Sequence, residues 1–261
     1  KDYGLGTGNV TWESTKTYVL DGLVFVNEGQ TLTIEAGTVI KGKSGQGENA
    51  SALIVARGGK LMAEGTASAP IVMTSAADQI HYSHVNTVVE GSGNLPVDVS
   101  GLWGGLIVLG KATNNNTSEK RIEGIPAGED RALYGGSEDT DDSGVIKYLS
   151  IRHGGTDIGT GNEINGFTLG SVGSGATIDY VEIVSNQDDG IEWFGGAANM
   201  KHIIVAYCGD DSYDYDEGYH GKNQFMVAMQ KEGVGDRLGE HDGGPSDNEV
   251  GTPYAEPMFY N

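Results

Sequence analysis

Two acidic segments of this chain repeat each other at a spacing of 22 residues. The first is NQDDGIEW at residues 186–193, and the second is CGDDSYDY at residues 208–215. A fixed period of this length is typical of solenoids, in which each repeat buries its apolar face against the next. Alternating apolar residues follow the same offset: Ile178, Val181 and Ile183 correspond to Met200, Ile203 and Val205, and one further step reaches Phe225 and Val227.

Glycine supports the solenoid interpretation. It accounts for 43 of 261 residues, more than twice the usual share of about 7%, and it falls at turns without a collagen period. We find no amphipathic helix of about ten or more residues, which argues against Rossmann and barrel enzymes built from alternating helices and strands. The chain is therefore predicted to be an all-β, right-handed parallel β-helix with about 22 residues per rung.

The rest of the chain fits one such domain over residues 1–261, interrupted by long loops. Apolar runs too short for helices alternate with turn residues, which predicts strands at 18–20, 23–26, 32–34, 53–56, 60–63, 71–74 and 101–109. Ile146, Leu149 and Ile151 match Ile178, Val181 and Ile183 at an offset of 32, so that rung carries an insertion. We expect loop excursions near 76–100, 111–143 and 154–166, and we expect the natural chain to continue beyond residue 261.

Three segments carry a family resemblance: GLWGGL at 101–106, NQDDGIEWFGG at 186–196 and GDDSYDYDEG at 209–218. They resemble signature segments of secreted, cell-surface bacterial right-handed parallel β-helix proteins of the Bacteroidetes type, which have a pectate-lyase-like fold. The resemblance covers nearly the whole chain. It implies the fold and an extracellular or outer-surface location, and it implies no particular activity.

The 22-residue register stacks acidic side chains in columns about 4.8 Å apart. It predicts columns of Asp188, Asp210 and Glu232, of Asp189 and Asp211, and of Glu192, Asp214 and Asp236. Two carboxylates at this distance repel by about 1 kcal/mol in water and by more where solvent is excluded, and a hard cation relieves that repulsion. Ca²⁺ suits an irregular shell of carboxylate and carbonyl oxygens. The predicted ligands are Asp188, Asp189, Glu192, Asp210, Asp211, Asp214, Asp216 and Glu217, although their spacing is not that of an EF-hand.

The alternative is that these acids are solvated turn residues that bond to the backbone, with Asp179, Asp188 and Asp210 marking corners. The neighbouring aromatic residues are likewise open to two interpretations. Trp193, Tyr213, Tyr215 and Tyr219 could form a platform for a sugar, or Trp193 and Tyr215 could pack as a ladder on one outer face. We expect Tyr180 to stack on His202 as part of the structure.

An enzyme on the same fold is a further alternative. A polysaccharide lyase would use Ca²⁺ and a basic residue, for which Arg152, Lys222 and Arg237 are candidates. A glycoside hydrolase would use two carboxyl groups from among Asp188, Asp189, Asp210 and Asp211. His153 and His220 are candidate bases, although a histidine at a rung corner is more often structural.

Charge and composition limit the classes of molecule that this chain is expected to bind. A net charge of −21 argues against binding to nucleic acid or to an anionic membrane, and no apolar stretch approaches the roughly 20 residues of a transmembrane helix. The single cysteine, Cys208, excludes an intrachain disulfide framework, and a start at Lys1 fits a processed secreted protein. We therefore predict a secreted structural, adhesive or glycan-contacting module stabilised by Ca²⁺, whose partners are a surface glycan or another surface protein. The alternatives are a carbohydrate-active enzyme and a self-assembling subunit of a surface filament or layer.

Overall fold

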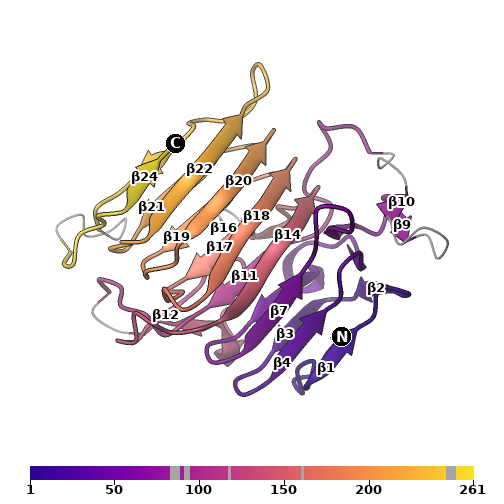
Figure 1. Cartoon of the computed structure of the whole chain (residues 1–261), viewed down its shortest axis with the longest axis horizontal. Helices are drawn as coiled ribbons and strands as arrows, with labels where there is room; N and C mark the ends of the chain where they lie inside the picture. The colour runs from indigo at the N-terminus through magenta and orange to yellow at the C-terminus, as the bar shows by residue number, and fades with distance from the viewer. Residues whose placement is uncertain (83–88, 91–94, 117–118, 160–161, 245–250) are drawn as a thin grey trace.

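The chain winds through two large sheets along a common axis, as Figure 1 shows. The structure is a computed structural model that describes residues 1–82, 89–90, 95–116, 119–159, 162–244 and 251–261. Sheet A has 11 strands and sheet B has seven, and all the pairs within them are parallel. The predicted all-β parallel β-helix is therefore confirmed.

Sheet A contains β1 (Val10–Trp12), β2 (Thr17–Leu20), β4 (Thr31–Ile34), β5 (Val39–Gly42), β7 (Lys60–Glu64), β8 (Ile71–Ser75), β14 (Gly144–Arg152), β18 (Thr177–Val184), β20 (Met200–Ala206), β22 (Lys222–Met229) and β24 (Met258–Tyr260). Sheet B contains β3 (Leu23–Val26), β6 (Ala52–Val55), β11 (Leu106–Leu109), β17 (Phe167–Gly170), β19 (Ile191–Phe194), β21 (Tyr213–Asp216) and β23 (Glu240–His241). Apart from the short 3-10 turns η1 (Gly47–Asn49) and η2 (Asp130–Ala132), the described residues contain no helix. The sequence places β11 too early, because residues 101–105 form a corner and the strand begins at Leu106.

The path of a rung changes along the axis. In the N-terminal rungs the chain crosses sheet A on two separate strands before it enters sheet B. From β14 onward these two strands are continuous, since the first half of β14 pairs with β7 and the second half with β8. The bend falls at Tyr148, which has a φ of 48°. A single residue therefore replaces the whole 65–70 turn of the preceding rung.

Aromatic residues stack along this bend. Tyr148, Tyr180, His202 and Phe225 all have positive φ, between 48° and 61°. Their rings stack in sequence, with centroids 4.5, 4.2 and 4.9 Å apart. A left-handed conformation costs a non-glycine residue about 1–2 kcal/mol, and each aromatic pair returns about 0.5–1.5 kcal/mol. The predicted stacking of Tyr180 on His202 is confirmed, and it offsets the strain at the corner.

The predicted register holds for most of the C-terminal half. Ile178 pairs with Met200 at the expected offset of 22, and Ile146 pairs with Ile178 at the expected offset of 32. The predicted pairing of the following rung is wrong, because Ile203 pairs with Met226 rather than with Phe225. One additional residue in the connection between β20 and β22 shifts the register. Phe225 and Val227 consequently point outward and are exposed.

The three predicted excursions are connections between sheets. Residues 76–100 contain the antiparallel pair β9 (His81–Tyr82) and β10 (Val89–Glu90), and 83–88 and 91–94 lie outside the described residues. Residues 111–143 contain η2 and the antiparallel pair β12 (Lys120–Arg121) and β13 (Leu133–Tyr134). The 154–166 insertion contains β15 (Asp157–Gly159) and β16 (Asn162–Glu163).

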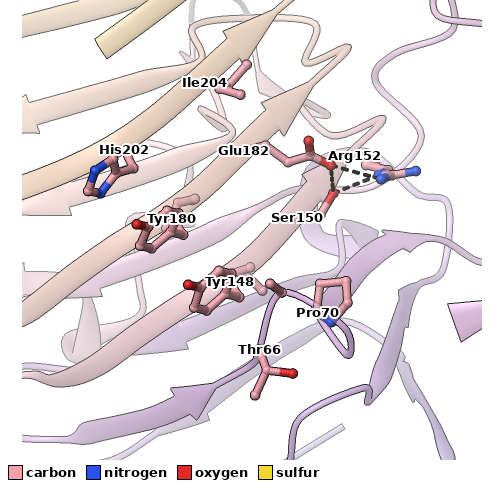
Figure 2. Close-up of a pocket in the computed structure, with 12 residues that line it drawn as sticks. Thr66, Pro70, Tyr148, Ser150, Arg152, Tyr180, Glu182, His202 and Ile204 are labelled. Atoms are coloured by element: carbon pink, nitrogen blue, oxygen red, sulfur yellow. Dashed lines mark hydrogen bonds and ion pairs between the residues drawn. The ribbon is translucent and has the colours of Figure 1, made fainter. Parts of the chain in front are cut away.

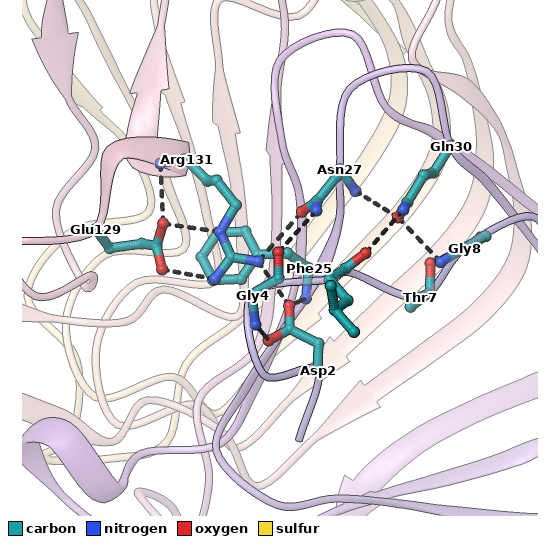
Figure 3. Close-up of polar contacts among 10 residues, drawn as sticks. Asp2, Gly4, Thr7, Gly8, Phe25, Asn27, Gln30, Glu129 and Arg131 are labelled. Carbon is teal, nitrogen blue, oxygen red and sulfur yellow. Dashed lines mark hydrogen bonds and ion pairs between the residues drawn. The ribbon is translucent and has the colours of Figure 1, made fainter.

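The 111–143 excursion covers the outer face of sheet B and buries a second apolar core there. Ile122 and Tyr134 from the excursion belong to the same buried cluster as Phe25, Ile54 and Ile107 from the sheet. Arg131 fixes one end of this cover, as Figure 3 shows. Its guanidinium lies 3.8 Å from the centre of the Phe25 ring and forms ion pairs with Asp2 at 2.7 Å and Glu129 at 2.6 Å. The excursion is therefore an integral part of the fold.

Candidate functional site

The outer face of sheet B changes from apolar to acidic along one column of paired residues. Pairing between successive strands aligns Phe25, Ile54, Ile107, Thr168, Glu192, Asp214 and Glu240. The apolar members are buried beneath the excursion, whereas the acidic members lie at its edge, where residues of the excursion still face them. Side chains two residues apart share a face of a strand, so Phe194 and Asp216 lie beside this column.

An open cavity of about 380 Å³ lies at this boundary. We call it the acidic cleft. Sheet B and the residues after it contribute Glu192, Phe194, Asp214, Asp216, Glu240 and Asp242, and the excursion contributes Lys120, Arg121, Glu123 and Tyr134. The sequence alone does not indicate Glu123 and the two basic residues, because nothing in a loop sequence shows which strand the loop covers. It does not indicate Glu240 and Asp242 because the longer connection after β21 breaks the 22-residue offset.

The carboxyl groups of the acidic cleft interact closely. Glu192 is buried, and Asn165 Nδ2 donates a hydrogen bond of 2.5 Å to its Oε2. Its carboxyl group is within hydrogen-bonding reach of Glu123 and Asp214. Burial, followed by the charges of those two neighbours, raises the pKa of Glu192 well above its usual range. Burial also raises the pKa of Asp214, to about 7.

A second cluster lies at the adjoining corner of the rungs, and its Asp189 also forms a group with Glu192 and Asp214 of the acidic cleft. Three trios each place one oxygen per residue within 4.8 Å of the others: Asp188, Asp189 and Asp210; Asp189, Glu192 and Asp214; and Asp210, Asp211 and Asp236. Burial and then neighbouring carboxylates raise the pKa of Asp188 to about 7 and that of Asp189 to about 9. Oxygen-only donors packed this closely have the chemistry that Ca²⁺ prefers.

Two of the corner acids also bond to the backbone of the next rung. Asp189 Oδ1 accepts a hydrogen bond of 2.8 Å from the amide of Asp211, and Asp211 Oδ1 accepts one of 2.5 Å from the amide of Arg237. This is the turn chemistry that the alternative interpretation expects. It engages one oxygen of each carboxylate, so the structural and metal-binding roles are compatible.

Glu217 belongs to a different network. It is buried, and its carboxylate accepts hydrogen bonds of 2.7 Å from both Tyr134 Oη and Asn116 Nδ2 and forms an ion pair with Lys120. These partners satisfy the carboxylate without a metal, and Glu217 belongs to none of the three trios, so its role as a ligand stays a prediction. Asp216 is also outside the trios, but its Oδ1 is buried without a hydrogen-bond partner among the described residues.

The predicted third member of the column that begins with Glu192 and Asp214 is wrong. Asp214 pairs with Glu240, at an offset of 26, rather than with Asp236. The longer connection between β21 and β23 moves Asp236 to the corner, where its carboxylate joins Asp210. Glu232 belongs to none of the three trios.

The aromatic residues between the acids face inward. Trp193, Tyr213 and Tyr219 are buried in the main core, and the partly buried Tyr215 packs against it. Trp193 stacks on Tyr219 at 5.1 Å, and Tyr215 stacks on His241 at 4.5 Å. The three buried rings have no free face for a sugar. Because Trp193 and Tyr215 lie on the inner side of sheet B, the predicted outer-face ladder is wrong as well.

The candidate catalytic bases are scattered. Arg152 and Lys222 lie on sheet A, whereas Arg237 forms ion pairs with Asp236 at 3.0 Å and Glu240 at 2.7 Å. His153 is buried, and its Nδ1 is 2.6 Å from the carbonyl oxygen of Val99. His220 Nδ1 is 3.0 Å from the carbonyl oxygen of Gly218. Of these five candidates, Arg237 is the one with a described contact to a residue of the trios or of the acidic cleft.

The family model of the pectate-lyase like beta helix domain matches residues 4–261. The chain belongs to this pectate-lyase-like β-helix family. The match includes the excursions as well as the sheets, so the acidic cleft is part of the family domain. Searches of curated proteins and of solved structures returned no match. The described part of the chain contains no helix long and apolar enough to cross a membrane.

Proposed function

We propose that this chain is a Ca²⁺-stabilised β-helix module of a secreted, cell-surface protein that contacts glycans or other surface molecules. The observation that carries the proposal is the trio of Asp189, Glu192 and Asp214, which brings carboxylates from successive rungs within 4.8 Å of one another. Among the residues that line the acidic cleft, acids outnumber bases, so the cleft becomes negatively charged as these carboxyl groups ionise. A cation relieves the repulsion that burial intensifies.

Ca²⁺ fits this site better than smaller or softer ions. Mg²⁺ requires near-octahedral geometry and keeps its water, whereas Ca²⁺ tolerates six to eight irregular oxygen ligands. The described cluster supplies oxygens and neither sulfur nor imidazole nitrogen. Asn165 Oδ1 and Asp216 Oδ1, which have no hydrogen-bond partner among the described residues, are further candidate ligand atoms close to this cluster. Extracellular Ca²⁺ modules bind at about 0.1–1 mM, so millimolar Ca²⁺ at the proposed location would occupy a site of that kind.

The direct test is calorimetric titration of the chelator-treated protein with Ca²⁺, in parallel with Mg²⁺. We expect saturable Ca²⁺ binding that Glu192→Gln together with Asp214→Asn weakens by at least about tenfold. A matched control is Glu13→Gln with Asp21→Asn, which makes the same charge change at exposed ion pairs. The absence of Ca²⁺ binding, or equal loss in both double variants, would contradict the proposal.

A second function, a carbohydrate-active enzyme, is favoured by one observation. Glu123 and Glu192 lie together in an open cleft that also contains Lys120 and Arg121. A carboxyl group with a raised pKa can act as a general acid, and a basic residue can serve a lyase. The test is release of reducing ends or unsaturated uronates from a polysaccharide panel, lost in Glu123→Gln with the fold intact. An inactive parent protein across the panel would remove this candidate. Self-assembly remains a prediction, to be tested by sedimentation in Ca²⁺.

A further inference from the structure

A second cavity, of about 250 Å³, lies on the outer face of sheet A. We call it the sheet A groove. It crosses β14, β18 and β20, and Figure 2 shows two columns of side chains along it. One column is aromatic and consists of Tyr148, Tyr180 and His202; the other is polar and consists of Ser150, Arg152 and Glu182. The acidic cleft is on sheet B, so the two cavities are separate sites.

The polar column is a connected set with spare hydrogen-bonding capacity. Arg152 Nε donates to Ser150 Oγ at 2.7 Å, and its Nη2 donates to Glu182 Oε1 at 2.8 Å. Ser150 Oγ donates to the same carboxylate oxygen at 2.6 Å. Among the described residues, no hydrogen bond engages Arg152 Nη1 or Glu182 Oε2. A donor and an acceptor thus remain on one locally neutral, preorganised pair.

The aromatic column forms the other wall. The faces of Tyr180 are covered by Tyr148 and His202. Tyr148 is the end of the stack, since no described ring covers its second face, and the 66–70 turn lines the groove next to it with Thr66, Ala67 and Pro70. The lining of the sheet A groove is mostly apolar, and it also includes Leu149, Val181 and Ile204. The groove therefore combines apolar contact with a free donor and a free acceptor on its polar column.

The pairing of the strands limits what can bind there. β14, β18 and β20 are each hydrogen-bonded to neighbours on both edges, so no free backbone edge remains for an extended peptide. Recognition must use side chains. The neutral Arg152–Glu182 pair and a net charge of −21 disfavour anionic polymers.

We infer that the sheet A groove binds a neutral sugar of a glycan chain. A hydroxyl group both donates and accepts, so vicinal hydroxyls match Arg152 Nη1 and Glu182 Oε2 together. The apolar face of a sugar ring would lie against the carbon-rich wall formed by Tyr148 and Pro70. This inference rests on the proposed glycan contact and places it away from the acidic cleft.

The test is calorimetric titration with cellohexaose, mannohexaose and xylohexaose, with hexagalacturonate as the anionic comparison. We expect at least one neutral hexasaccharide to bind, and Glu182→Gln, which converts the free acceptor into a donor, to weaken binding by at least about tenfold. Glu13→Gln, which makes the same charge change at an exposed ion pair outside the groove, should bind as the parent does. Unchanged affinity in Glu182→Gln would overturn the inference.

A second measurement does not depend on how the variants fold. Hydrogen exchange of the parent protein with the bound hexasaccharide should slow in β14 and β18. Protection confined to β19 and β21 would move the glycan to the acidic cleft, overturning this inference but leaving the proposed glycan contact intact. If only hexagalacturonate binds, this inference fails and the proposed glycan contact stands. If none of the four hexasaccharides binds, both glycan proposals fail, whereas Ca²⁺ stabilisation is decided separately by its own titration.

Discussion

Glu192 and Asp214 are paired residues on neighbouring strands of sheet B, and their carboxylate oxygens lie within 4.8 Å of each other. Asp189 completes the trio from the preceding corner. The backbone pairing of the β-helix fixes the spacing of the two strands, and burial of Glu192 and Asp189 limits how far their carboxylates can rotate apart. Charge in the trio must therefore be neutralised by protons or by a cation, and the two solutions make opposite predictions about pH.

In Ca²⁺-free protein, we expect stability to fall as pH rises from about 5 to about 9. The pKa values of Asp188 and Asp214 are raised to about 7 and that of Asp189 to about 9, so the folded state binds more protons here than the unfolded state does. Stability from such groups is complete below their unfolded pKa near 4 and is lost as pH passes the folded pKa. Thermal melts of the protein in chelator, at several pH values between about 5 and about 9, measure whether stability falls as pH rises.

Saturating Ca²⁺ should reverse this loss, with an effect that grows with pH because protons compete for the same oxygens. At one hundred times Kd, the gain is about 2.7 kcal/mol, or roughly 5–10 °C in melting temperature for a domain of this size. The same melts in Mg²⁺ control for ionic strength. A Ca²⁺ shift that is equal at about pH 5 and about pH 8 would show that the ion does not bind these carboxylates.

Glu192→Gln should stabilise the Ca²⁺-free protein at about pH 8 by roughly 1 kcal/mol or more, because burying the Glu192 carboxyl group at that pH costs free energy, either as a charge or as the uptake of a proton. The amide oxygen can still accept from Asn165 Nδ2, so the local packing is retained. In Ca²⁺ the same variant should be less stable than the parent. Denaturant unfolding at both conditions measures this crossover, and Glu13→Gln, at an exposed ion pair, should show none.

Glu217→Ala should destabilise the protein by about 3 kcal/mol whether or not Ca²⁺ is present, since it leaves Tyr134 and Asn116 without their acceptor and Lys120 without its ion pair. The Ca²⁺-induced gain in stability should be the same as in the parent. A loss of that gain in Glu217→Ala would instead identify Glu217 as a ligand, as the sequence alone suggested.

The sequence predicts the fold well because the repeat is visible in the residues themselves. The two Asp-Asp segments mark equivalent corners, and the register between Glu192 and Asp214 follows from their offset. Beyond Tyr215 no such marker remains, and the additional residues before Glu240 moved the third acid of the column. Register is predictable where a recognisable sequence repeat marks the same positions in consecutive rungs, as it does at the offsets of 32 and 22.

The composition of the site was harder to predict. Ile191 and Trp193 alternate with Glu192, and this period of two places Trp193 inside the solenoid, as its burial shows. Proximity to acidic residues suggested an exposed ring instead. Glu123 could not be placed at all, because the position of a loop over a sheet depends on long-range packing such as that of Tyr134 against Phe194.

The aromatic stack on sheet A provides a test of how the corners are stabilised. Tyr180→Ala removes two ring contacts but keeps the strained φ of 54°, so we expect a loss of about 2 kcal/mol. Tyr180→Gly removes the same contacts and relieves the strain, so it should be less harmful by about 1 kcal/mol. Denaturant unfolding compares the pair. If alanine were the better replacement, strain at this corner would be negligible.

Arg131 connects the excursion to the N-terminal rung, and its geometry requires a guanidinium. Its Nε and Nη2 donate to the two oxygens of Glu129 at 2.8 and 2.6 Å, while the group also lies over Phe25. Lysine cannot reproduce this bidentate, stacked arrangement, so Arg131→Lys should cost about 1–2 kcal/mol. Arg57→Lys, at a more exposed ion pair with Glu119, should cost about 0.5 kcal/mol or less.

The excursion forms one wall of the acidic cleft, so Arg131→Lys should also weaken Ca²⁺ binding if it loosens the packing of the excursion on sheet B. Unchanged Ca²⁺ affinity with reduced stability would show that sheet B alone holds the metal-binding carboxylates in place.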